Sequence, residues 1–141
     1  MKYVFMSGRL ERQAELRSYA DQLKNLGIQV TSNWLWEDIP DAEVIDASPG
    51  AYPVTAATIR LARISELRHC DTVLVFTEHP GTMSRGNRHI EYGIAVGMAM
   101  TRKLRIIIIG PVELLLHADS NTVRFDSFTD MLNSRRADIW Q

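Results

Sequence analysis

Residues 86–93 carry the side chain whose chemistry is easiest to define. They place Glu91 about one turn into a predicted helix, after a turn that contains Gly86. A carboxylate so placed could attack the anomeric carbon of a sugar, as in the cleavage of an N-glycosidic bond. That cleavage passes through a cationic, oxocarbenium-like state, which a carboxylate beneath the anomeric carbon stabilises and can trap covalently. Spacing alone leaves an alternative open, in which Glu91 only complements the partial positive charge of the helix N-terminus.

A second candidate site, Ser7-Gly8-Arg9, follows the first apolar run of the chain and opens a predicted helix. Free backbone N–H groups and the helix dipole favour an anion at such a place, and Arg9 could donate two hydrogen bonds to a phosphate. The alternative is that Ser7 caps the helix, Gly8 makes the turn and Arg9 is solvated. The segment is not a P-loop, because the Gly-Lys-Ser/Thr ending is absent.

An aromatic and acidic group at residues 34–38 could bind a base and protonate it. Trp34 or Trp36 would supply an indole for stacking, and Glu37 or Asp38 a carboxylic acid close to it. The alternative is that Trp34 belongs to the core and that the acids form a solvated lid. The four histidines and Cys70 lack the spacing of metal ligands, so we expect neither a metal nor a cofactor.

The composition predicts one compact domain over residues 1–141. Apolar residues make up 45% of the chain, charged residues 23%, and the net charge is -1. A chain so balanced is not expected to bind nucleic acid or membranes in general, because both need a basic surplus. One cysteine, no signal-peptide core and no apolar run of membrane-spanning length lead us to expect a soluble, cytoplasmic protein.

Apolar periodicity predicts strands that alternate with helices. The strands are expected at residues 3–6, 28–31, 72–76, 104–109 and 123–125, and the helices at residues 10–26, 55–69, 87–100 and 127–132. Strands that are continuously apolar indicate a parallel sheet covered on both faces. We therefore predict an α/β fold, a three-layer, doubly wound (flavodoxin- or Rossmann-like) sheet of about five parallel strands.

In such sheets, ligands bind beyond the carboxyl ends of the strands. Three predicted loops lie at that edge, at residues 7–9, 34–53 and 77–87. The first two loops each contain a candidate site, and the third leads directly into the segment at 86–93. The long loop is expected to be functional, because irregular stretches of this length are uncommon in compact domains.

Six segments of the chain, in this order and spacing, resemble the nucleoside 2-deoxyribosyltransferase superfamily, which includes 2′-deoxynucleoside 5′-phosphate N-hydrolases. The segments are residues 3–9, 27–35, 70–76, 86–95, 106–111 and 123–128. The most specific is Gly-Asn-Arg-His-Ile-Glu-Tyr-Gly-Ile-Ala at residues 86–95, which looks like the segment around the nucleophilic glutamate of the family. The resemblance covers nearly the whole chain.

The resemblance implies that Glu91 is the nucleophile and that the sugar or its 5′-phosphate lies near Ser7 and Arg9. It also implies a homo-oligomer with active sites near subunit boundaries. The small and apolar residues of the helix at 87–100 independently favour an interface, most simply that of a homodimer. The full set of predicted substrate-binding residues is Ser7, Gly8, Arg9, Trp34, Ser84, Arg85, Gly86, Arg88 and His89.

The chain departs from the family at two acidic positions. Arg63 and Arg85 stand where the family has aspartates that help to hold the sugar or manage the proton on the base. Candidate acid partners are therefore Glu37, Asp38 and Glu66. Two arginines in place of two acids suit an anionic ligand, which favours nucleoside monophosphates over free nucleosides.

Three functions follow as hypotheses. The first is an N-glycosidase, in which water (hydrolase) or a second base (transferase) completes the turnover. The second is a nucleotide-binding or sensing protein on the same fold with little catalysis. The third is a cytokinin-type phosphoribohydrolase chemistry, ranked last because its Gly-Gly-x-Gly-Thr pattern is absent.

Overall fold

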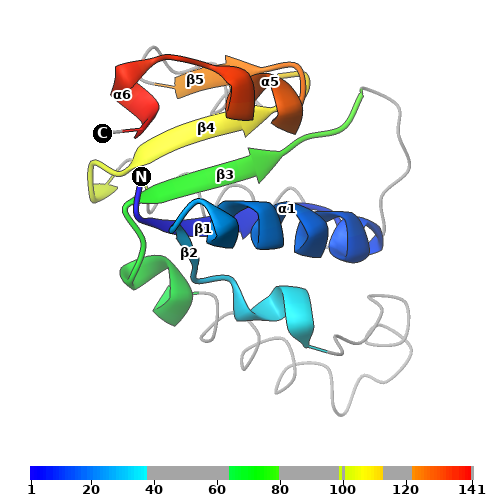
Figure 1. Ribbon diagram of the computed structural model, residues 1–141. Coiled ribbons are helices and arrows are strands. Elements are labelled where there is room, and N and C mark those ends of the chain that lie inside the picture. Colours follow the sequence, from blue (N-terminus) through cyan, green and yellow to red (C-terminus); the bar gives the residue numbers. More distant parts are fainter. Residues whose placement is uncertain (38–63, 80–98, 100, 113–121, 141) are drawn as a thin grey trace.

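A five-stranded parallel sheet forms the centre of the molecule. The computed structural model describes residues 1–37, 64–79, 99, 101–112 and 122–140. The strands are β1 (Tyr3–Ser7), β2 (Gln29–Val30), β3 (Thr72–Phe76), β4 (Arg105–Ile109) and β5 (Thr122–Phe125). Their order is β2-β1-β3-β4-β5, and every neighbouring pair is parallel (Figure 1). With its flanking helices, this sheet confirms the predicted doubly wound α/β fold.

The central strands form because they are apolar on both faces. Every residue of β3 is buried, and so are the four isoleucines of β4. Ser7 pairs with Val75, and Phe76 pairs with Ile109, so the carboxyl ends of β1, β3 and β4 meet at one edge. The edge strand β2 is shorter than the predicted strand at 28–31, because only Gln29 and Val30 pair with β1.

The predicted helix at 10–26 is confirmed, with a tighter first turn. A 3-10 turn, η1 (Leu10–Arg12), leads into α1 (Gln13–Asn25), which buries Leu16, Ala20 and Leu23. Gly27 follows with φ of 81°, as predicted for a residue that ends a helix in the left-handed conformation. The N–H groups of Gly27 and Ile28 donate to the carbonyls of Lys24 and Leu23, which completes a Schellman motif.

The C-terminal part contains α5 (Phe128–Asn133) and α6 (Ala137–Trp140). Ser127, predicted as the first residue of a helix, is its N-cap, and its side chain accepts a hydrogen bond from the N–H of Asp130 at 3.1 Å. Helix α6 is not predicted by the sequence, because four residues are too few to show a helical period. The 3-10 helix η2 (Asn33–Trp36) is also not predicted.

Helices α1 and α5 lie on the same face of the sheet (Figure 1). Tyr19 of α1 stacks on Phe128 of α5 with ring centroids 4.2 Å apart, and on Phe76 of β3 at 5.7 Å. Of the predicted helix at 55–69, residues 64–68 are described and are helical. Of that at 87–100, Ala99 is described as helical and buried, so the rest of its predicted interface lies outside the described residues.

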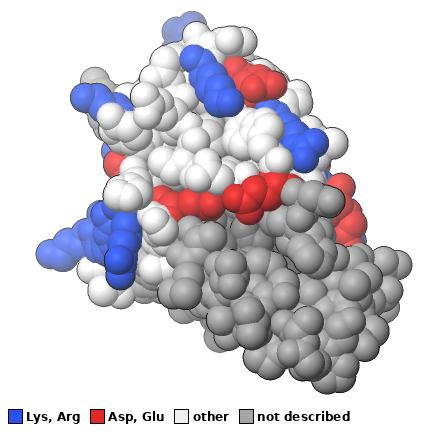
Figure 2. Space-filling model, turned by 90° about the horizontal axis from the view of Figure 1, so that it is seen from below, with Lys and Arg blue, Asp and Glu red and all other residues white. Residues whose placement is uncertain are grey.

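Charges of both signs are distributed over the described surface. Figure 2 shows Lys and Arg in several separate groups, with Asp and Glu between them. Within the described ranges, no helix is long and apolar enough to cross a membrane.

Candidate functional site

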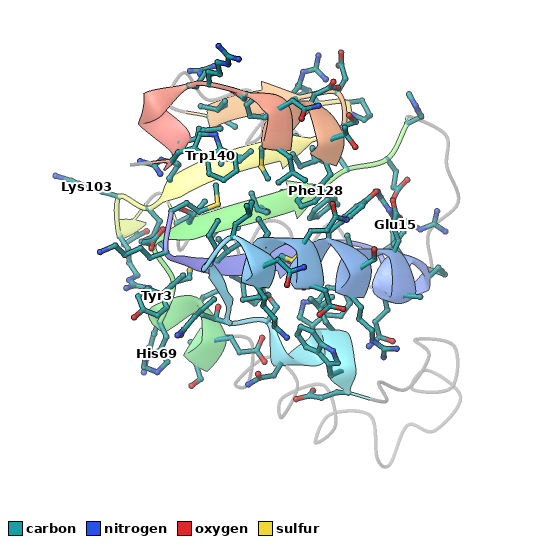
Figure 3. The ribbon with its side chains drawn as sticks, in the orientation of Figure 1. Tyr3, Glu15, His69, Lys103, Phe128 and Trp140 are labelled. Carbon is teal, nitrogen blue, oxygen red and sulfur yellow. The ribbon has the colours of Figure 1, made fainter. Side chains whose placement is uncertain are left out.

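The candidate site lies at the carboxyl edge of the sheet, between the ends of β1 and β3. The strand order reverses at this point, since β2 lies on one side of β1 and β3 on the other. In doubly wound sheets, such a switch point opens the crevice that binds ligands. Glu15 and Phe128 lie on this side of the molecule, and Tyr3 and Lys103 on the opposite side (Figure 3).

Ser7 and Gly8 form the turn that leaves β1. Ser7 ends the strand and is buried with 6% of its surface exposed. A Cβ on Gly8 would lie 2.8 Å from Cδ1 of Leu16 and 3.4 Å from Cβ of Phe76. A side chain at this position would thus require Leu16 to shift, because α1 packs closely on the sheet here.

Arg9 has unused hydrogen-bonding capacity at this turn. Its Nε lies 3.4 Å from a carboxylate oxygen of Glu11, yet it is buried and has no hydrogen-bond partner among the described residues. A buried guanidinium nitrogen without a hydrogen bond is costly. An anion bound at this turn would supply the missing acceptor, and the phosphate-binding role of Arg9 stays a prediction.

Arg12 was not singled out from the sequence, and it connects two elements at this edge. Its guanidinium donates to both oxygens of Glu15 at 2.7 and 3.0 Å and to Glu78 at 3.1 Å. It also lies over the ring of Phe76, 5.5 Å from the centroid. The hydroxyl of Tyr19 donates to Glu15 at 2.8 Å. We call Arg12, Glu15, Tyr19 and Glu78 the Arg12 network.

Mutual stabilisation sets the protonation states of the Arg12 network. Desolvation by burial lowers the pKa of Arg12, but Glu15 and Glu78 outweigh this effect and hold the pKa above its usual value. The hydrogen bond from Arg12 lowers the pKa of Glu15 below its usual value. Burial and the bond to Glu15 raise the pKa of Tyr19. Arg12 and Glu15 therefore stay ionised at neutral pH, and Tyr19 keeps its proton.

Thr77 ties the ends of β3 and β4 together. Its N–H donates to the carbonyl of Ile109 at 3.0 Å, and its hydroxyl donates to the carbonyl of Pro111 at 2.5 Å. Gly110 has φ of 116°, and a Cβ there would lie 2.7 Å from the hydroxyl of Thr77. Thr77 therefore leaves no room for a side chain at position 110.

Trp34 lies in the core beside β1. It is 3% exposed, and its indole N–H donates to the carbonyl of Met6 at 2.7 Å. The N–H of Met6 in turn donates to the hydroxyl of Ser32 at 2.5 Å. A ring so buried offers no stacking face in this structure, so the geometry favours the core alternative. A substrate-binding role for Trp34 is therefore not supported here.

Glu37 is exposed and directly follows η2, at the start of the predicted long loop. The side chain of Gln13 donates to the carbonyls of Trp34 and Glu37, which fixes η2 against the start of α1. Trp36 is 44% exposed, and the ammonium of Lys24 lies over its ring at 4.2 Å. Because Gln13 stands at the start of α1, Glu37 lies on the carboxyl side of the sheet, and the functional role of the loop stays a prediction.

Glu66 lies away from this edge. It is 7% exposed and sits in the helical residues 64–68, and its carbonyl accepts the N–H of His69 at 3.2 Å. His69 lies near Tyr3, at the amino end of the sheet (Figure 3). The helix leads into β3, so its last turn is at the amino edge. This position does not favour Glu66 as the acid partner.

The remaining predicted site residues lie outside the described residues. They are Asp38, Ser84, Arg85, Gly86, Arg88, His89 and Glu91, together with the substituted position Arg63. Their roles stay predictions. Of the described candidates, the structure brings Ser7, Gly8 and Arg9 together at the carboxyl edge, with Glu37 on the loop that leaves it.

Comparison with solved structures finds a similar fold. No protein-family model matches the chain, and no curated protein does. Its structure is similar to that of the Clostridium botulinum CMP N-glycosidase BcmB, with a TM-score of 0.52 over 93% of this chain and 95% of that one. The two sequences are 19% identical. The likeness supports the sequence resemblance at the level of the fold.

Proposed function

We propose that this protein cleaves or transfers at the N-glycosidic bond of a (deoxy)nucleoside or nucleoside 5′-monophosphate. The observation that carries the proposal is the fold shared with a CMP N-glycosidase over nearly the whole length of both chains. The segment at 86–95, which resembles that around the nucleophilic glutamate of the deoxyribosyltransferases, supports it independently.

In the proposed reaction, the carboxylate of Glu91 attacks C1′ of the sugar. The C1′–N bond breaks, and the base leaves with a proton from a carboxylic acid, for which Glu37 or Asp38 is the candidate. The product is a glycosyl ester of Glu91. Water or a second base then attacks C1′ from the opposite face and releases Glu91, which gives a hydrolase in the first case and a transferase in the second.

The 5′-phosphate is assigned to the turn at Ser7-Gly8-Arg9. The support for this placement is the position of the turn at the switch point of the sheet and the buried Nε of Arg9, which lacks a hydrogen bond among the described residues. Ser84, Arg85 and Arg88 are candidate helpers. This arrangement favours nucleoside monophosphates over nucleosides.

The experiment is a substrate panel with a nucleophile variant. Nucleosides and their 5′-monophosphates are incubated with the protein, with and without an acceptor base, and free base and new nucleoside are quantified by chromatography. Glu91→Gln should lower turnover by several orders of magnitude, because the amide is no nucleophile. The control is Asp21→Asn, which changes an exposed carboxylate of α1 in the same way. A Glu91→Gln protein with wild-type turnover would end the assignment.

A second function is favoured by one specific observation, the arginines at positions 63 and 85. These arginines stand where the resembling family has aspartates that help to manage the proton on the base. If the base therefore receives no proton, the protein binds nucleotides and senses them without cleavage. Tight nucleotide binding by the wild type without release of base, under all conditions of the panel, would establish this function in place of the first.

A further inference from the structure

The ion pair of Arg12 with Glu78 joins two segments that leave the carboxyl edge of the sheet. Arg12 ends η1, which follows the turn at Ser7-Gly8-Arg9, and Glu78 is the second residue after β3. In the proposed function, the first of these segments holds the 5′-phosphate. The second leads along the chain to the predicted nucleophile, Glu91.

On the side of β1, Arg12 is attached to the turn that is assigned to the phosphate. Its N–H donates to the carbonyl of Arg9 at 3.1 Å, so both residues belong to one tight turn of the backbone. A Cβ on Gly8 would lie 3.4 Å from Cβ of Phe76. The guanidinium of Arg12 lies over the ring of the same Phe76. The turn and Arg12 therefore both rest on the last residue of β3.

On the side of β3, a single nitrogen of Arg12 makes the contact. Nη1 donates to Oε1 of Glu78 at 3.1 Å and to the carbonyl of Thr77 at 3.4 Å. Nε and Nη2 donate instead to Glu15, which lies on α1 close to Arg12 in the chain. The guanidinium thus has two separate sets of partners, and only the contacts of Nη1 cross from one segment to the other.

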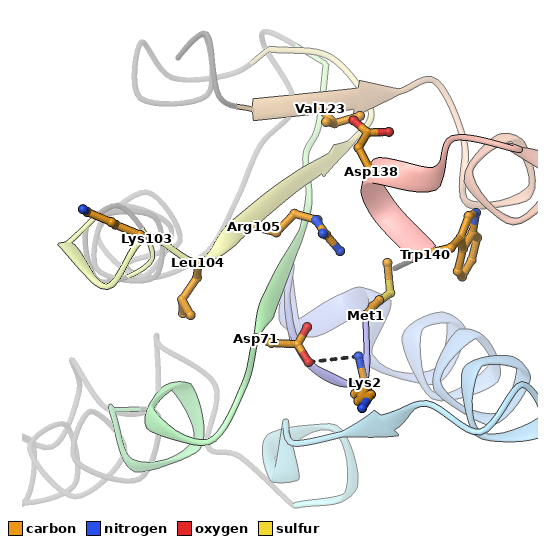
Figure 4. A pocket seen from close by; sticks show the side chains of 9 residues that line it. All are labelled: Met1, Lys2, Asp71, Lys103, Leu104, Arg105, Val123, Asp138 and Trp140. Carbon is orange, nitrogen blue, oxygen red and sulfur yellow. Dashed lines mark hydrogen bonds between the residues drawn. The ribbon is translucent and has the colours of Figure 1, made fainter.

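The same two strands are held at their amino ends by a different contact. Asp71, directly before β3, accepts hydrogen bonds from the N–H groups of Lys2 at 2.9 Å and Tyr3 at 2.8 Å. Figure 4 shows the bond to Lys2 beside a cavity at this edge. At the other end, the pairing of β1 with β3 stops at Ser7 and Val75. Beyond these residues, side chains such as Arg12 must set the distance between the two segments.

This distance matters for a substrate that is held at two points. In a nucleoside 5′-monophosphate, the ribose joins the phosphate to C1′, so a phosphate at the turn fixes where C1′ can lie relative to the nucleophile. A displacement of about 1 Å at the reacting atoms can cost about 10²-fold in rate. The pair of Arg12 with Glu78 is largely buried, so its geometry is better defined than that of an exposed pair.

We propose that Arg12 is a positioning residue for the proposed reaction. Through Glu78, it sets the distance between the turn that holds the 5′-phosphate and the segment after β3 that is predicted to carry Glu91. It acts without contact to the substrate, and the inference rests on the proposed function. A nucleoside lacks the phosphate and is held at fewer points, so its cleavage depends less on this distance.

The test is steady-state kinetics of Arg12→Gln and Glu78→Ala. The substrates are the nucleoside 5′-monophosphate that the wild type cleaves fastest in the panel and the matching nucleoside. For the monophosphate, kcat should fall by about ten-fold or more in both variants. Its KM should change much less, because Arg9 still holds the phosphate. For the nucleoside, kcat should also change much less than for the monophosphate.

The double variant Arg12→Gln/Glu78→Ala should lose no more activity than the more affected single variant, because both substitutions break the same pair. Two controls separate positioning from stability. Glu15→Ala removes the partner of Nε and Nη2, and Asp71→Asn removes the contact at the opposite ends of β1 and β3. Both controls should lower the melting temperature, and neither should change kcat.

Four results would overturn the inference. They are wild-type kcat in both Arg12→Gln and Glu78→Ala, equal losses of kcat in the controls, additive losses in the double variant, and a higher KM with unchanged kcat. The last result would mean that Arg12 binds the phosphate itself. With an active wild type, these results leave the proposed function intact. A wild type that releases no base from any substrate would overturn the proposed function together with this inference.

Discussion

Nη1 of Arg12 lies 3.1 Å from Oε1 of Glu78, an ion pair between the start of α1 and the segment that follows β3. The two residues are 66 positions apart in the chain. Both side chains are largely buried, with 23% of Arg12 and 16% of Glu78 exposed. The pair lies at the carboxyl edge of the sheet, on the side of α1 and next to the turn at Ser7-Gly8-Arg9.

Arg12→Gln should destabilise the fold. The substitution removes hydrogen bonds to two carboxylates and leaves Glu78 without its arginine partner. The expected loss in free energy of unfolding is about 1–3 kcal/mol. Urea denaturation measures it. The matched control is Arg136→Gln, whose exposed pair with Asp138 should contribute much less than the Arg12 network. Equal losses in both variants would show that burial adds nothing to the Arg12 network.

Arg9→Ala should weaken the binding of a nucleoside 5′-monophosphate by about ten-fold or more, since a charge-assisted hydrogen bond contributes about 1.5–3 kcal/mol. Binding of the matching nucleoside should be nearly unchanged. Calorimetry with both ligands measures the difference, and Arg136→Ala serves as the control. Equal losses for the two ligands would show that Arg9 is structural.

Asp71→Asn should lower stability at neutral pH and make the protein less sensitive to acid. Burial raises the pKa of Asp71, but hydrogen bonds from Thr72, Tyr3 and Lys2 outweigh it and hold the pKa below its usual value. The ionised form therefore contributes stability that is present above the unfolded-state pKa, about 3.9, and is lost as the pH falls through the lower folded-state value.

The measurement for Asp71→Asn is the melting temperature of wild type and variant from neutral pH down to acid. The difference should shrink below about pH 4. Asp21→Asn, at an exposed position of α1, should show almost no difference at any pH. A difference for Asp71→Asn that stays constant into acid would assign its effect to the changed side-chain shape.

Cys70 should not react in the native protein. Burial raises the pKa of its thiol to about 11, and its Sγ contacts the carbonyl of Leu67 at 3.2 Å. The reactive thiolate is thus scarce at about pH 8, where an ordinary thiol of pKa about 8.5 reacts readily. A colorimetric thiol reagent should label the protein only after unfolding in urea. Rapid labelling of the native protein would show that this part of the core opens readily.

Local sequence was sufficient for most of the fold. The apolar runs at 72–76 and 104–109 predicted the whole of β3 and of β4, because a strand that is buried on both faces has no polar alternation. Gly27 and Ser127 marked the end of α1 and the start of α5, since left-handed φ and N-capping depend on a single residue type. The turn at Ser7-Gly8-Arg9 follows β1 as predicted, because the first apolar run ends at Ser7 and Gly8 marks a turn.

Tertiary structure decided what depends on the path of the chain. No local pattern distinguishes a stacking indole from the buried Trp34, whose N–H is bound by a carbonyl 28 positions earlier in the chain. Glu66 was a candidate acid partner from the sequence, and the direction of its helix places it at the amino edge of the sheet. The Arg12 network joins residues from distant segments. Contacts of this kind arise only when the strands pair, because sequence periodicity reports which face is buried and not what it is buried against.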